Sequence, residues 1–165
     1  VIKDNPRLLP KGHYRRNPVR VVVDSRLKIP LDSKLVKTAE KAPLIIATTK
    51  LSSERKKRLL NKKNVNVIVI KSSKTGVNLE DLLKILGRMG ILHILAEGGA
   101  ELAGSLCDKK LVDRILFFIS PKIIGGRDAI TSIKGRGVNR IKDALKLENV
   151  EVKRFKDDVV VSGDI

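Results

Sequence analysis

Residues 44–70 read LIIATTKLSSERKKRLLNKKNVNVIVI, and this stretch decides the fold class. Two uncharged apolar runs, residues 44–47 and 65–70, are typical of strands buried on both faces. Residues 53–63 between them are polar and basic apart from two leucines, and Ser52 or Ser53 can cap a helix there. A strand, a helix and a second strand in this order favour a parallel sheet covered by helices.

The same alternation continues on both sides of this stretch. Residues 19–23 predict a further strand, and leucines spaced three and four apart predict a helix that Asn78 caps and Gly90 ends. Strands are then expected at residues 91–96 and 114–119, with a helix after the glycine pair, and an antiparallel hairpin at residues 150–155 and 159–162. The prediction is therefore an α/β domain over residues 1–165, with a mainly parallel sheet, flanking helices and a C-terminal antiparallel hairpin.

Composition narrows the class of protein. The 165 residues carry 35 Lys and Arg against 18 Asp and Glu, a formal charge of +17. Such a charge is typical of nucleic-acid binders, but the cations are spread among acids, and only four aromatic residues could stack on bases. No apolar run approaches the ~20 residues that cross a bilayer, and no leader is visible at residue 1. The single cysteine, Cys107, excludes an internal disulfide and is expected to serve packing. A cytoplasmic protein is expected.

A glycine turn is the first candidate site. Residues 95–103 read LAEGGAELA, so a predicted strand ends in Glu97, Gly98 and Gly99 and turns directly into a helix. Ligands of open α/β sheets bind at the carboxyl ends of strands, and a helix N-terminus with nearby glycines can hold a phosphate. Glu97 would orient a polar substrate. The alternatives are that the glycines only make a tight turn and that Glu97 accepts bonds from local N–H groups.

A second candidate site follows the strand at residues 19–23. Asp24, Ser25, Arg26 and Lys28 place a hydroxyl and two cations at the strand end. This chemistry suits a phosphate monoester such as the 2′-phosphate of NADP, provided that Asp24 turns away and caps the local turn. An ordinary turn with solvated charges is the alternative.

Five short blocks in order resemble a known family. They are DNPRL at residues 4–8, VRVVVDSRL at 19–27, LAEGG at 95–99, LVDR at 111–114 and SPKIIGG at 120–126. Together they resemble the riboflavin-biosynthesis pyrimidine reductases, whose fold is similar to that of dihydrofolate reductase. The resemblance covers nearly the whole chain. It implies a homodimeric, NADPH-dependent enzyme that reduces the ribosyl group of a ribosylaminopyrimidine 5′-phosphate to ribityl.

The resemblance also implies roles for individual residues. By position, Leu8, Lys11 and Glu97 would contact the pyrimidine nucleotide, and no residue is assigned to catalysis itself. The residues that the resemblance expects to bind the cofactor are Asp4, Ser25, Gly99, Ala100, Glu101, Leu102, Ala103, Gly104 and Ser105. The chemistry of the two candidate sites adds Arg26 and Gly98 to this set.

The chain departs from the family pattern in two places. Family members usually begin with a strand, a helix and a second strand, and this chain is expected to lack them because it starts just after that point. Leu9, Pro10 and Lys11 stand where Thr-Val-Arg is common, so Lys11 replaces an arginine that binds substrate. The alternatives kept open are a dihydrofolate reductase-like oxidoreductase with another substrate and a basic nucleic-acid-binding module. Between 2-amino and 2-oxo pyrimidines, the 2,5-diamino substrate is favoured.

Overall fold

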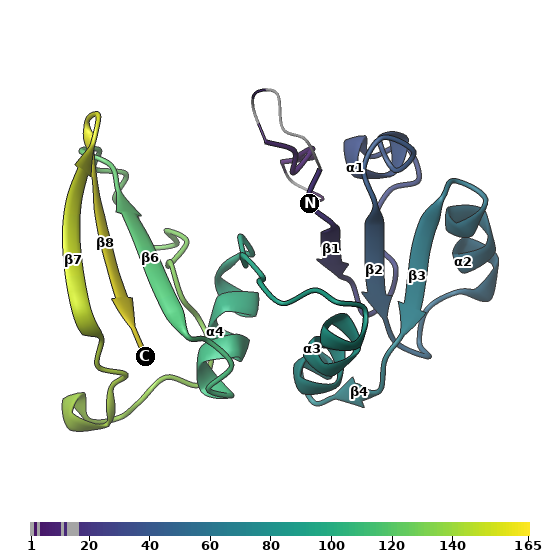
Figure 1. Cartoon of the computed structure of the whole chain (residues 1–165). Helices are drawn as coiled ribbons and strands as arrows, with labels where there is room; N and C mark the ends of the chain where they lie inside the picture. The colour runs from purple at the N-terminus through teal and green to yellow at the C-terminus, as the bar shows by residue number, and fades with distance from the viewer. Residues whose placement is uncertain (1, 3, 11, 13–16) are drawn as a thin grey trace. The chain divides into compact units, whose positions relative to one another are not determined.

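A computed structural model describes residues 2, 4–10, 12 and 17–165 of the chain. The chain divides between Leu92 and His93 into two compact units, each with its own three-stranded sheet (Figure 1). No helix among the described residues is both long and apolar enough to cross a membrane.

The first unit is built on a parallel sheet. Strands β1 (Arg20–Val23), β2 (Leu44–Thr48) and β3 (Val65–Val69) lie side by side in that order, as Figure 1 shows. In the register, Ile46 of β2 lies between Val22 and Val67. All five residues of β2 are buried, which explains why it has four apolar residues in succession and no charged residue. The three strands and their parallel pairing confirm the prediction.

Helices α1 (Lys34–Lys37), α2 (Glu54–Asn61) and α3 (Leu79–Arg88) complete this unit, and the longer two were predicted. The Ser53 hydroxyl accepts the Lys56 N–H at 3.4 Å, and Asn78 accepts the Asp81 N–H at 3.2 Å. These side chains satisfy helix N–H groups that would otherwise lack partners. The core beneath the helices is aliphatic and contains Leu27, Ile29, Leu35, Ile46 and Leu60.

The second unit holds an antiparallel sheet. Its elements are helix α4 (Ala100–Asp108), strand β6 (Arg114–Ile119), the 3-10 helix η1 (Ile141–Asp143), and strands β7 (Glu148–Phe155) and β8 (Asp158–Asp164). Strand β8 lies between β6 and β7. The predicted C-terminal hairpin is confirmed, and β6 extends it to three strands.

The predicted strand at residues 91–96 is wrong. Residues 91–99 carry no regular secondary structure, and Leu92 and Leu95 are 82% and 75% exposed. A strand requires a neighbour that pairs with its N–H and C=O groups, and within the described part of the chain this segment has none. The Ile91 N–H instead donates to the Leu86 carbonyl at 3.1 Å, at the end of α3.

Candidate functional site

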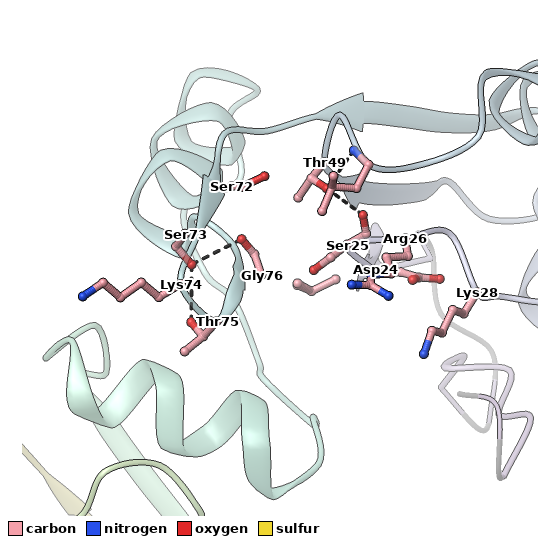
Figure 2. A pocket seen from close by; sticks show the side chains of 12 residues that line it. Asp24, Ser25, Arg26, Lys28, Thr49, Ser72, Ser73, Lys74, Thr75 and Gly76 are labelled. Atoms are coloured by element: carbon pink, nitrogen blue, oxygen red, sulfur yellow. Dashed lines mark hydrogen bonds between the residues drawn. The ribbon is translucent and has the colours of Figure 1, made fainter.

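A cavity of about 460 Å³ opens at the carboxyl ends of the parallel strands. Parallel strands bring these ends together at one edge of a sheet, where open α/β sheets bind their ligands. Figure 2 shows residues that follow β1 and β2 facing a short hairpin beyond β3. The lining residues are Val23, Asp24, Ser25, Arg26, Lys28, Thr49, Leu51, Ser72, Ser73, Lys74, Thr75 and Gly76.

Asp24 caps the turn after β1. Its backbone N–H donates to Ala47 O at 2.9 Å, and its Oδ2 accepts the Ile29 N–H at 2.8 Å. Asp24 carries the only carboxylate among the residues that line the cavity, and one of its oxygens is therefore already hydrogen-bonded within the turn. This confirms the expectation that Asp24 caps the local turn. The expectation mattered because a phosphate can be bound by Ser25 and Arg26 only if the Asp24 carboxylate turns away from it.

Ser25 is fixed through its backbone. The Ser25 carbonyl accepts from the N–H of Thr49 at 3.3 Å and from its hydroxyl at 2.8 Å, and Thr49 is fully buried. The Ser25 side chain is half-buried, and Arg26 and Lys28 are exposed. The structure thus brings a hydroxyl and two cations to one cavity, as the sequence predicted.

The facing hairpin was not predicted. Strands β4 (Ser72–Ser73) and β5 (Gly76–Val77) pair across a tight turn at Lys74 and Thr75. The Ser73 hydroxyl donates to Gly76 O at 3.2 Å and lies 3.3 Å from the Thr75 hydroxyl. The Thr-Gly pair after a serine-rich stretch is the sequence signal that could have located it.

The N-terminal segment packs on the first unit. Asp4 is exposed, and Leu8 packs against the aliphatic core with a φ of 50°. The buried Arg20 holds the segment, because its Nη1 donates to Arg7 O at 3.1 Å and to the Thr38 hydroxyl at 2.7 Å. Lys11, a predicted substrate contact, lies outside the described residues. Nothing in the sequence pattern singled out Arg20.

The glycine turn lies in the second unit. Gly99 is the N-cap of α4, and an added Cβ there would meet no atom of the described residues within 4 Å. At Gly98, an added Cβ would meet the Leu102 side chain at 2.6 Å. Glu97 is exposed, with no hydrogen bond to a local N–H in the described part of the chain. Its carboxylate is therefore accessible to a ligand.

A loop covers one side of α4. The Lys134 N–H donates to Ala100 O at 3.0 Å, and its ammonium lies 3.3 Å from Glu101 Oε1. An added Cβ at Gly104 would collide with the Lys134 carbonyl oxygen, so this glycine permits the close approach of the loop. Of the predicted cofactor residues, Ala100, Glu101 and Gly104 thus have contacts within the protein. Leu102, Ala103 and Ser105 are half-buried.

Comparison with known proteins identifies the family. The RibD C-terminal domain matches residues 1–161 of this chain. The chain belongs to the RibD C-terminal domain family. It is 37% identical to the riboflavin biosynthesis protein RibD of Actinobacillus pleuropneumoniae over 98% of its own length. It is 34% identical to the 2,5-diamino-6-ribosylamino-4(3H)-pyrimidinone 5′-phosphate reductase of Archaeoglobus fulgidus over 91% of its length.

The chain spans 43% of the RibD relative and 71% of the Archaeoglobus protein. Among solved structures, RibD of Acinetobacter baumannii superposes with a TM-score of 0.79 at 19% identity, over 99% of this chain and 44% of that one. The riboflavin biosynthesis reductase Rib7 of Saccharomyces cerevisiae superposes with a TM-score of 0.73 at 20% identity, over 99% of this chain and 69% of that one. The fold is therefore the dihydrofolate reductase-like fold that the sequence blocks implied.

Within this RibD C-terminal domain, Cys107 is a poor nucleophile. Partial burial raises the pKa of its thiol, and the negative charge of Asp108 raises it further. A thiol with a raised pKa remains protonated near neutral pH, where the thiolate would be the reactive form. This agrees with the predicted packing role.

The expectation that the glycine turn binds NADPH predicts that Gly99→Val weakens NADPH binding and leaves the fold intact. The side chain would enter open space in the free protein, but it would occupy the approach of a pyrophosphate to the N-terminus of α4. Fluorescence titration measures the affinity, and circular dichroism checks the fold. An unchanged affinity in a folded variant would contradict the assignment of the glycine turn to the cofactor.

Proposed function

We propose that this RibD C-terminal domain is the NADPH-dependent reductase of riboflavin biosynthesis. It would convert the ribosyl group of a ribosylaminopyrimidine 5′-phosphate into a ribityl chain. The observation that carries the proposal is the match to the Archaeoglobus protein, which is named as such a reductase and of which the chain spans 71%.

Each unit, taken by itself, offers groups whose chemistry suits a part of NADPH. The cavity of the first unit offers the Ser25 hydroxyl and the Arg26 and Lys28 cations to a 2′-phosphate. The glycine turn offers the N-terminus of α4 to the pyrophosphate, since Gly99 provides no capping side chain. NADPH, when bound, supplies the hydride that reduces C1′ of the sugar in its open-chain imine form. The protein supplies position and electrostatics.

The proposed substrate contacts are Leu8, Lys11 and Glu97. Leu8 is half-buried on a segment that Arg20 anchors, so it presents a fixed apolar surface. Glu97 is an exposed carboxylate that can accept bonds from substrate hydroxyls or amines. The preferred substrate is the 2,5-diamino pyrimidine.

The decisive assay follows NADPH consumption with each of the two pyrimidines on the protein as expressed from its gene. Turnover with the 2,5-diamino compound and little with the 2-oxo compound is expected. Turnover with neither, but with another substrate, would favour a different dihydrofolate reductase-like oxidoreductase. Absence of saturable NADPH binding, together with steeply salt-dependent binding of nucleic acid, would favour the basic binding module.

A homodimer is a further part of the proposal. The sheet of the second unit exposes Val152, Phe118 and Phe155 to 67%, 65% and 61%, and such apolar surface is typical of an interface. Light scattering at micromolar concentration should give twice the mass of the chain. A mass equal to one chain across that range would contradict dimerisation.

A further inference from the structure

The β4–β5 hairpin faces the candidate phosphate-binding residues across the cavity. It supplies five of the twelve lining residues, from Ser72 to Gly76. In Figure 2 the Ser72 hydroxyl points toward the side of the cavity formed by Thr49 and Ser25. Within the described part of the chain, this hydroxyl makes no hydrogen bond.

Gly76 lets the hairpin lie close to the Ser25 side chain. An added Cβ at Gly76 would lie 2.5 Å from the Ser25 hydroxyl oxygen, which would have to turn away from its present position. The φ of Gly76 is 124°, a conformation that side chains disfavour. The turn is further held by the bond from Ser73 to Gly76 O. The hairpin therefore stands at a defined place beside Ser25.

The chemistry of the two walls is complementary. One wall holds the cations Arg26 and Lys28, and the other holds the hydroxyls of residues 72, 73 and 75 together with Lys74. A phosphate monoester has three terminal oxygens pointing in different directions, and it is best bound by donors from more than one side. The lining contains no aromatic residue on which a base or ring could stack.

We propose that the β4–β5 hairpin is the second wall of the site for the 2′-phosphate of NADPH, with Ser72 as a donor and Gly76 as the residue that sets the spacing. This inference rests on the proposed function, and it makes the hairpin a determinant of specificity for NADPH over NADH. Lys74 lines the cavity, but Figure 2 shows its ammonium pointing away from Arg26, so it is not part of this wall.

The test uses adenosine 2′,5′-bisphosphate and 5′-AMP as probes, with affinities measured by calorimetry on the full chain. Ser72→Ala changes no charge and should lower the affinity for the bisphosphate by about tenfold while leaving that for 5′-AMP unchanged. Gly76→Ala should also lower the ratio of the affinity for the bisphosphate to that for 5′-AMP, because its Cβ would displace the hairpin or the Ser25 side chain. Lys74→Ala, which removes a charge from the same hairpin, should change the ratio by less than about twofold.

The outcomes separate this inference from the function on which it rests. A wild-type protein that binds both probes equally would overturn the assignment of the cavity to NADPH. A wild-type preference that survives in both Ser72→Ala and Gly76→Ala would overturn the hairpin wall alone. A larger effect of Lys74→Ala than of Ser72→Ala would also overturn it, because general electrostatics would then account for the preference.

Discussion

Replacing both Ser25 and Arg26 by alanine should reduce the preference for NADPH over NADH about a hundredfold. A hydrogen bond to a charged group contributes roughly 1.5–3 kcal/mol, and the variant removes the two donors that we propose for the 2′-phosphate. NADH lacks this phosphate, so its kcat/KM should change little. Steady-state kinetics with both cofactors measure the ratio.

The structure indicates that this double variant will fold. The bonds that fix the turn use the Ser25 carbonyl, with Thr49 as donor, and the carboxylate of Asp24, and alanine leaves both unchanged. Lys63→Ala is a matched control, since it removes an exposed cation beyond α2, outside the cavity lining. It should leave the ratio unchanged. Equal loss of activity with both cofactors in the double variant would show that the segment supports the fold and does not bind the phosphate.

The sheet of the first unit could be predicted from sequence because its signals are local. Strand β2 is buried throughout, so every residue had to be apolar or small. Ser53 and Asn78 cap their helices through their own side chains, a pattern that needs no knowledge of the rest of the fold. The grouping of Asp24, Ser25 and Arg26 at one cavity was also predictable, since these residues directly follow a strand.

The features that sequence reasoning missed depend on distant partners. Residues 91–96 have the composition of a strand, but pairing determines whether a strand forms, and composition does not reveal a partner. Strands β4 and β5 have two residues each, too few to show alternation. Gly76 matters to the shape of the cavity only because Ser25, 51 positions earlier in the chain, lies against it. Arg20 likewise acquires its role from acceptors on Arg7 and Thr38.

Replacing Glu97 by glutamine should lower turnover about ten- to hundredfold with little effect on NADPH affinity. The substitution keeps the size of the side chain and removes the charge that would strengthen the bonds that we propose between Glu97 and substrate. Single-turnover kinetics and fluorescence titration measure the two effects separately.

The exposed position of Glu97 makes this outcome interpretable. In the described structure its carboxylate bonds to no local N–H group, so the substitution breaks no contact that shapes the glycine turn. Glu40→Gln is the matched control, because it removes an exposed carboxylate that lies outside both the glycine turn and the cavity lining. The control should keep its turnover. If Glu97→Gln instead abolishes NADPH binding, Glu97 organises the cofactor turn and does not orient the substrate.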